Sequence, residues 1–245
     1  MHAFIAQKIY PELADLTLEE INLNHKDKRQ NAKAAGFAIQ YGGVGKTIAD
    51  NLGLPIEEGE KIYNGYFEAF SGVKEYFEKC KAQVTEDGYV LLNNVSKRKS
   101  FVDFYDDFVA IKKVVKAKGF WTEYKDHKSR NTAKFTDYYK PKAKEFFKWQ
   151  GAMERKSYNY PIQGSSAEIT KLAALKFFNY IKSVNLHKTV KICNIVHDEI
   201  VIECSKQQSS FMADSLQKFM EDAGKPFCPI VPLKAQPVVS LEWEH

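Results

Sequence analysis

Four side chains recur every four residues near the start of the chain, two cations and then two aromatics: Arg29, Lys33, Phe37 and Tyr41. In an α-helix each step of four residues turns the side chain by about 40°, so the four follow one slowly winding face roughly 18 Å long. A nucleoside triphosphate presents the same order, a polyanion at one end and sugar with base at the other. The spacing therefore predicts cations against phosphates and aromatics against sugar and base. An ordinary surface helix with its aromatics turned into the core would have the same spacing.

A second candidate group is the pair His197-Asp198, which joins two apolar runs rich in β-branched residues, 190–196 and 200–204. This pattern predicts two well-buried strands joined by a turn. Strands hold a carboxylate at their tip rigidly, and phosphoryl transfer by two metal ions needs acidic oxygens that bind both cations. Asp198 is therefore the predicted ligand of Mg²⁺. Taken alone, a His-Asp pair between two strands is more often an ordinary hairpin turn.

The helix pattern also carries a family resemblance. The segment from Arg29 to Gly42, R-Q-N-A-K-A-A-G-F-A-I-Q-Y-G, resembles motif B of the family A DNA polymerases, R-x3-K-x3-F/Y-x3-Y-G. The resemblance implies that the segment is the mobile fingers helix, on which Arg29 and Lys33 hold the phosphates of an incoming dNTP. It implies that Phe37 and Tyr41 line the base and sugar. Phe37, in place of Tyr, implies discrimination against nucleotides that lack a 3′-hydroxyl, and Lys33 is counted among the catalytic candidates.

The segment His197-Asp198-Glu199 is similar to motif C of the same family, V-H-D-E, at the tip of the palm hairpin. This similarity implies that Asp198 is a catalytic carboxylate and a ligand of the two Mg²⁺ ions. It gives Glu199 a supporting catalytic role and makes His197 a contact to the primer end.

A third segment, R-K-S-Y-N-Y-P-I-Q-G-S from Arg155 to Ser165, resembles the family pattern R-x3-N-x-P-x-Q-G-T/S. The resemblance implies that Arg155, Asn159 and Gln163 follow the primer and template strands through the minor groove. Hydrogen-bond donors suit this task, because every correct base pair offers acceptors at similar minor-groove positions. Polar capping around a proline break is the alternative interpretation.

One family motif is missing. Motif A, D-Y-S-x-I-E-L-R, supplies the other Asp that bridges the metals, and it does not occur in residues 1–28. The expectation is a fragment or split subunit of a DNA-directed DNA polymerase. It would need a second polypeptide, or a missing N-terminal region with thumb and motif A, for two-metal transfer to a primer 3′-OH. A noncatalytic DNA-binding remnant is the alternative, and a single-subunit RNA polymerase, whose palm motif usually reads H-D-S, ranks last.

The elements that must position these residues are mostly helices. Apolar periodicity and stop signals predict helices over 2–21, 28–41, 46–52, 55–70, 73–88 and 207–223, a hairpin over 89–102 and a final strand over 238–243. A further helix is predicted over 166–183, with Ser165 and Glu168 as its capping box and Pro161 preventing an earlier start. The predicted fold class is α+β, with helical fingers in 1–95 and the C-terminal half of an antiparallel-sheet palm in 151–245.

Residues 96–150 form a basic, aromatic-rich insert between these parts. They hold fifteen Lys or Arg and seven Asp or Glu, a net charge of +8, whereas the whole chain has +5. Cations interleaved with aromatics suit phosphate contact and base stacking, and they equally suit an amphipathic helical insert with solvated lysines and buried aromatics. The family resemblance implies no role for this insert.

The remaining composition excludes several classes of protein. No run of about twenty apolar residues and no secretion signal occurs, so no membrane association is expected. The four cysteines form no C-x-x-C pair, so neither a zinc site nor a disulfide framework is predicted. A cytoplasmic location fits these features.

Overall fold

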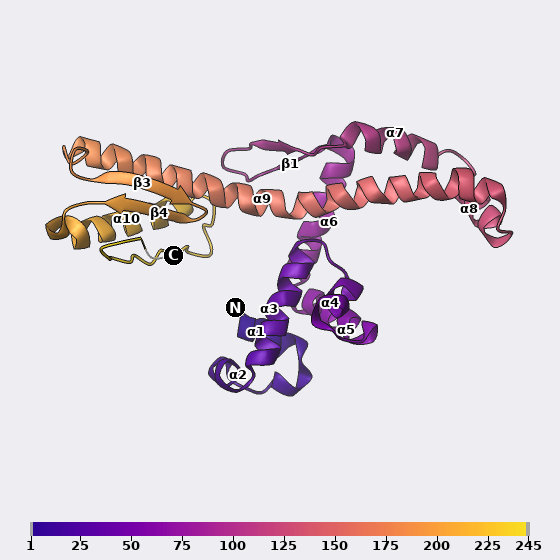
Figure 1. Ribbon diagram of the computed structural model, residues 1–245, viewed down its shortest axis with the longest axis horizontal. Coiled ribbons are helices and arrows are strands. Elements are labelled where there is room, and N and C mark those ends of the chain that lie inside the picture. The colour runs from indigo at the N-terminus through magenta and orange to yellow at the C-terminus, as the bar shows by residue number, and fades with distance from the viewer. Residues whose placement is uncertain (1, 244–245) are drawn as a thin grey trace. The chain divides into compact units, whose positions relative to one another are not determined.

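The computed structural model describes residues 2–243, which form an α+β fold of helices and two small antiparallel sheets (Figure 1). The α-helices are α1 His2–Ile9, α2 Leu18–Asn24, α3 Lys26–Gln40, α4 Gly45–Leu52, α5 Ile56–Ala69, α6 Ser71–Asp87, α7 Tyr105–Val115, α8 Phe120–Ser129, α9 Lys140–Ser183 and α10 Ser209–Gly224. The strands are β1 Tyr89–Leu91, β2 Lys99–Phe101, β3 Lys191–Val196 and β4 Glu199–Glu203. Two 3₁₀ turns, η1 Pro11–Leu13 and η3 Lys206–Gln208, and a π-helical turn, η2 Phe135–Tyr139, complete the order.

The chain divides into two compact units. The first comprises residues up to 90 together with 100–160, and the second comprises 91–99 together with the residues from 161 onward. Among the described residues, no helix has the length and apolar character needed to cross a membrane.

In the first unit, α3 packs on α1 through a face of small residues. Ala32, Ala35 and Gly36 are buried together with Ile39, and the three small residues let the two helices approach closely. The neighbouring pair α4 and α5 meets even more closely, because a Cβ on Gly59 would lie 2.3 Å from the Gly45 carbonyl oxygen. The core of this part therefore sits under α3 and leaves one face of that helix outward.

The first part of α9 is anchored on α6. The rings of Phe77 and Tyr158 stack with centroids 4.1 Å apart, and the Tyr76 hydroxyl donates to the Tyr158 carbonyl oxygen at 3.3 Å. Burial raises the pKa of Tyr158 to about 12, although the neighbouring Lys81 charge opposes the shift. These contacts position the segment of α9 that carries Arg155 and Asn159.

The insert is helical, and most of its aromatic side chains are core. Buried Phe108 packs with Val84 and Met153, and a second cluster contains Phe120, Phe135 and Tyr139. Four other aromatics of the insert are exposed and belong to neither core: Phe101, Phe104, Tyr138 and Phe147. The amphipathic interpretation therefore holds for the aromatics of the two clusters and not for these four.

In the second unit, β3 and β4 pair in antiparallel order beside α10 and the C-terminal part of α9 (Figure 1). Phe177 and Ile181 of α9, Ile200 of β4, and Met212 of α10 form its core. Val196 is opposite Glu199, and the register shifts between Ile192 and Asn194. The turn at residues 197 and 198 therefore lies at the end of a hairpin that packs on α9 and α10.

Three of the predicted elements are corrected by the structure at α9 and the hairpin. The helix predicted to start at 166 is part of α9, which begins at Lys140 and continues through Pro161. The Ser165 hydroxyl does not cap a helix but donates to the Leu92 carbonyl oxygen at 2.8 Å. The strands of the β3–β4 hairpin are also less buried than predicted, because only one face packs on the helices and Ile195 is 43% exposed.

Two further predictions fail at the ends of the described chain. The single helix predicted over 2–21 is broken, since α1 ends at Ile9, Pro11 starts a 3₁₀ turn, and Thr17 with Glu20 forms a capping box that starts α2 anew. The strand predicted over 238–243 is absent, and these residues have no regular structure. Within the described residues, neither of the two sheets includes this segment, so no neighbouring strand supplies it with backbone hydrogen bonds.

Candidate functional site

The predicted nucleotide-binding face lies on the outward side of α3. Phe37 is 47% exposed and Tyr41 is 54% exposed, so neither aromatic turns into the core. Lys33 and Arg29 are half-buried, one and two turns before Phe37, and the Lys33 ammonium lies 6.0 Å from the centre of the Phe37 ring. The surface-helix alternative, which required buried aromatics, is not what the structure has.

Lys33 and Arg29 make the first turns of this face electropositive, and their charges act on the nearby His2. The His2 and Phe37 rings are 6.1 Å apart. Burial lowers the pKa of His2, and the nearby positive charges of Lys33 and Arg29 lower it further. The same positive charges would attract an anion, because the charge that repels a proton on His2 attracts a negative group.

Beyond the aromatics, α3 ends at a hollow of about 590 Å³. Its walls include Phe37 and Tyr41 of α3, Thr47 and Asn51 of α4, and Arg155 of α9. The volume is within the range of small-molecule sites. The structure thus brings two of the predicted groups together, the aromatics of the first motif and the arginine of the third.

Gly42 makes this meeting possible. Its φ of +77° is in the left-handed region, and a Cβ there would lie 2.6 Å from Arg155 Cγ and 3.3 Å from Tyr158 Cε2. Glycine therefore serves both the turn that ends α3 and the close approach of α9.

The remaining residues of the third motif are distributed between the units. Arg155 is exposed and Asn159 half-buried in the first unit, and Gln163 is exposed in the second. All three lie on α9 at intervals of four residues. The following Gly164 is constrained, because a Cβ there would lie 2.7 Å from the Leu92 side chain.

The loop between β1 and β2 is fastened to α9 beside Gln163. The Asn93 amide donates to Glu168 Oε2 at 2.7 Å, and Arg98 NH1 lies 3.2 Å from Glu168 Oε1, an ion-pair distance without hydrogen-bond alignment. Burial by itself would raise the pKa of Glu168. Asn93, Ser96 and the positive charge of Arg98 together outweigh burial and hold that pKa below its usual value.

The motif-C residues occupy the tip of the β3–β4 hairpin. His197 and Asp198 form the exposed two-residue turn, and His197 has a left-handed φ of +52°. Glu199 begins β4, is half-buried, and accepts a hydrogen bond from Trp243 Nε1 at 2.8 Å. Asp198 is therefore exposed at the tip of the hairpin, and its neighbour Glu199 is engaged with the C-terminal segment.

The donor set at this tip fits one side of a magnesium site. Within residues 2–243 no cluster of three or more His, Cys, Asp or Glu has the arrangement to hold a metal. Mg²⁺ prefers hard oxygen ligands and often binds through one or two carboxylates together with substrate phosphates and waters. The exposed Asp198 carboxylate has the chemistry that such a site would need.

Several residues around the site were not predicted from the sequence. Thr47 and Asn51 have a four-residue spacing just after the glycine cluster, a signal that could have placed them on one helix face toward α3. Trp243 and Asn93 offered no such signal, because their partners Glu199 and Glu168 lie far away in the sequence.

The fold and site have known counterparts. The family model described as DNA polymerase family A matches residues 1–245 of this chain. The chain therefore belongs to DNA polymerase family A, which confirms the resemblance carried by the three motifs.

Individual relatives are DNA polymerases I of bacteria. The chain is 27% identical to that of Aquifex aeolicus over 89% of this chain and 30% of the relative, and 28% identical to that of Caldicellulosiruptor bescii over 94% and 22%. The solved POL domain of Pol1 from M. smegmatis, in complex with DNA primer-template and dNTP, has a TM-score of 0.64 and 22% identity, and covers 91% of this chain and 31% of that one. The chain thus shares that fold and spans less than a third of the length of these relatives.

Proposed function

We propose that this chain carries the dNTP-binding and part of the DNA- and metal-binding surface of a DNA-directed DNA polymerase. The observation that supports this most directly is the hollow at the end of α3, where Phe37 and Tyr41 meet Arg155 below a cationic helix face. In this proposal residues 1–95 are fingers, 96–150 an insert and 151–245 the C-terminal half of the palm.

The proposed roles on α3 follow its charge order. Arg29 and Lys33 bind the triphosphate, because charge-assisted hydrogen bonds to phosphate oxygens are stronger than neutral ones. Lys33 also balances negative charge that builds on the leaving pyrophosphate. Phe37 and Tyr41 contact sugar and base at the entrance of the hollow.

The DNA contacts are assigned to α9 and the hairpin. Arg155, Asn159 and Gln163 donate to minor-groove acceptors of the primer-template, and His197 contacts the primer end. The β1–β2 loop is hydrogen-bonded to α9 at Ser165 and Glu168, shortly after Gln163 in the sequence. These contacts orient the primer 3′-hydroxyl for attack on the α-phosphate.

Asp198 is the proposed ligand of Mg²⁺, and Glu199 supports the tip. When bound, two Mg²⁺ ions would lower the pKa of the primer hydroxyl and neutralise the departing pyrophosphate. We further propose that the second bridging carboxylate comes from a polypeptide segment other than these 245 residues, since their sequence contains no D-Y-S-x-I-E-L-R.

Nucleotide binding by the chain tests the α3 assignment. Titration of a dNTP with Mg²⁺ should give saturable binding that Lys33→Ala weakens by roughly tenfold or more, because a charge-assisted hydrogen bond contributes about 1.5–3 kcal/mol. Lys46→Ala, which removes an exposed lysine of α4 outside the face, is the control. Equal weakening by both substitutions would contradict the proposal.

Primer extension tests the metal assignment. Mixing the chain with a polypeptide that carries thumb and motif A should give Mg²⁺-dependent extension, whereas the chain alone should extend little. Asp198→Ala should abolish the restored activity while leaving dNTP binding in place. Undiminished extension by Asp198→Ala would remove Asp198 from the metal site.

A further inference from the structure

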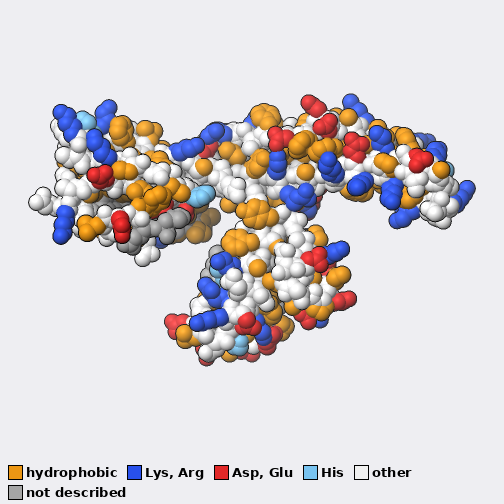
Figure 2. Space-filling model, viewed as in Figure 1, with side chains coloured by type: hydrophobic (Ala, Val, Ile, Leu, Met, Phe, Trp, Pro, Cys, Tyr) orange, Lys and Arg blue, Asp and Glu red, His pale blue; other side chains and the backbone are white. Residues whose placement is uncertain are grey.

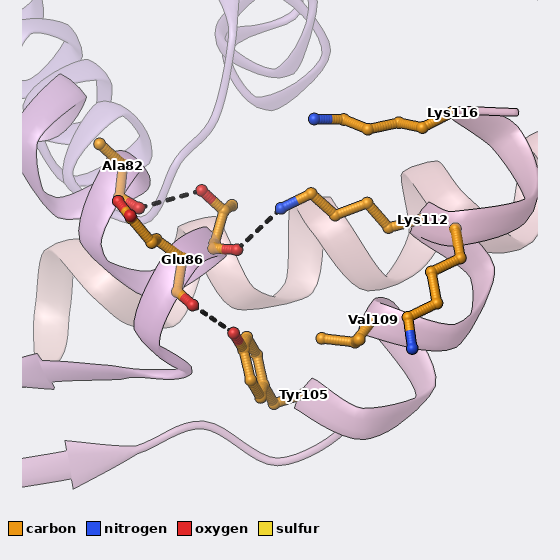
Figure 3. Close-up of a pocket in the computed structure, with 8 residues that line it drawn as sticks. Ala82, Glu86, Tyr105, Val109, Lys112 and Lys116 are labelled. Carbon is orange, nitrogen blue, oxygen red and sulfur yellow. Dashed lines mark hydrogen bonds between the residues drawn. The ribbon is translucent and has the colours of Figure 1, made fainter. Parts of the chain in front are cut away.

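A second hollow, separate from the one at α3, lies between α6 and α7 in the first unit (Figure 3). It has a volume of about 670 Å³. Three lysines of α7 and its end line it, Lys112, Lys113 and Lys116, with Glu86 of α6 as the one acidic residue in the lining. The hollow is therefore predominantly cationic.

The walls of this groove are fixed by hydrogen bonds to the end of α6. Lys112 Nζ donates to the Thr85 carbonyl oxygen at 3.0 Å, and the Tyr105 hydroxyl donates to the Glu86 carbonyl oxygen. These carbonyls are in the last turn of α6, where the helix has no N–H groups left to donate to them. These two hydrogen bonds hold α7 against the end of α6 without a ligand.

The outer lysines are available to a ligand. Lys113 and Lys116 are exposed, and within the described residues neither forms an ion pair. Lys112 and Lys116 are four residues apart, about 6 Å along the helix, and extend in the same direction from α7 (Figure 3). Figure 2 shows further Lys and Arg side chains over α7, α8 and the first half of α9.

We propose that this groove binds the phosphate backbone of a nucleic acid strand. Lys113 and Lys116 contact successive phosphates, and Lys112 adds its charge while holding the groove to α6. Such contacts carry no base specificity, and they add affinity by releasing counterions from the strand. The apolar Val109 and Ala82 also line the groove and offer a surface against which a sugar can pack.

A local explanation competes with this one. Lysines in the last turn of a helix stabilise its dipole, which requires no ligand. The dipole does not explain the hollow that these lysines share with α6, nor the net +8 of the surrounding insert. The two explanations differ in what removal of the outer lysines does to nucleic acid binding.

The test measures binding of a fluorescent oligonucleotide, single-stranded and duplex, as a function of salt. The variant Lys113→Ala with Lys116→Ala keeps the Lys112 hydrogen bond. Its slope of log K against log salt should be about 2 shallower than that of the wild type, roughly one for each lost phosphate contact. The matched control is Lys125→Ala with Lys128→Ala, two exposed lysines of α8 outside the groove.

Additional arms make the outcomes distinct. Glu86→Gln should tighten binding, because it removes the opposing charge from the groove. Equal slopes for the groove pair and the control pair, or no change for either, would overturn the proposal, as would binding of anionic vesicles without binding of oligonucleotides. The proposal is independent of nucleotide transfer. The double variant Lys113→Ala with Lys116→Ala should leave dNTP binding unchanged. In a Lys33→Ala background, the same double variant should still reduce the slope of log K against log salt by about 2.

Discussion

The indole nitrogen of Trp243 donates a hydrogen bond to the carboxylate of Glu199, with Nε1 2.8 Å from Oε1. Glu199 follows directly after the proposed metal ligand Asp198, at the start of β4. A side chain from the irregular C-terminal segment therefore contacts the strand that carries the tip. This contact ties the end of the described chain to the candidate site.

The first prediction concerns that tie. Trp243→Phe removes the donor, and Glu199→Ala removes the acceptor. A double-mutant cycle on the free energy of unfolding should give a coupling energy of about 1 kcal/mol. This value is smaller than that of a buried hydrogen bond to a charged group, because solvent screens the exposed pair. Glu203→Ala, at the far end of β4, should show no coupling to Trp243→Phe. A coupling near zero for the Glu199 pair would mean that the contact contributes nothing.

The second prediction separates the two functions of Gly42. Gly42→Ala and Gly53→Ala both place a side chain at a left-handed φ, +77° and +65°, so each should destabilise the chain by roughly 1–2 kcal/mol. Only the Cβ on Gly42 meets a neighbour, Arg155 Cγ at 2.6 Å, whereas the Cβ on Gly53 meets nothing within 4 Å. Gly42→Ala alone should therefore shift Arg155 and weaken binding of a primer-template duplex in titration. Equal binding by both variants would show that Arg155 adjusts without cost.

The third prediction concerns the fastened β1–β2 loop. The Asn93 side-chain amide donates to Glu168, and its side-chain oxygen Oδ1 accepts from the backbone nitrogens of Val95 and Ser96 at 3.0 and 2.8 Å. Asn93→Ala should lower the free energy of unfolding by about 1–3 kcal/mol, because Glu168 is left without its amide donor and the turn without its acceptor. Chemical denaturation measures this loss. The neighbouring exposed Asn94→Ala should change stability by less than about 0.5 kcal/mol.

The fourth prediction is the pH dependence of the same contact. The pKa of Glu168 is lowered in the folded chain, so its contribution to stability is present above its unfolded pKa, about 4.3, and is lost as the pH falls through the lower folded pKa. The stability difference between wild type and Glu168→Gln should therefore shrink on acidification from pH 6.5. Denaturant titrations at a series of pH values measure this difference, and Glu68→Gln, an exposed glutamate of α5, is the control. A difference that grows toward low pH would reverse the assigned sign.

The sequence by itself determined the local features of this protein. The four-residue spacing of Arg29, Lys33, Phe37 and Tyr41 gave a helix in the predicted place, and the His197-Asp198 pair gave a hairpin turn. Helical periodicity, glycine stops and β-branched runs act over a few residues, so the printed order of residues contains them. The same is true of the three ordered motifs that led to the family.

Only the tertiary structure decided which distant residues meet. Arg155 joins Phe37 and Tyr41 at one hollow, because Gly42 leaves room for α9 and Tyr158 stacks on α6. The helix predicted to start after Pro161 is instead the continuation of α9, which begins at Lys140. Local propensity cannot specify such outcomes, because the free energy that selects them comes from side chains far apart in sequence that bury area and satisfy hydrogen bonds only when the chain is folded.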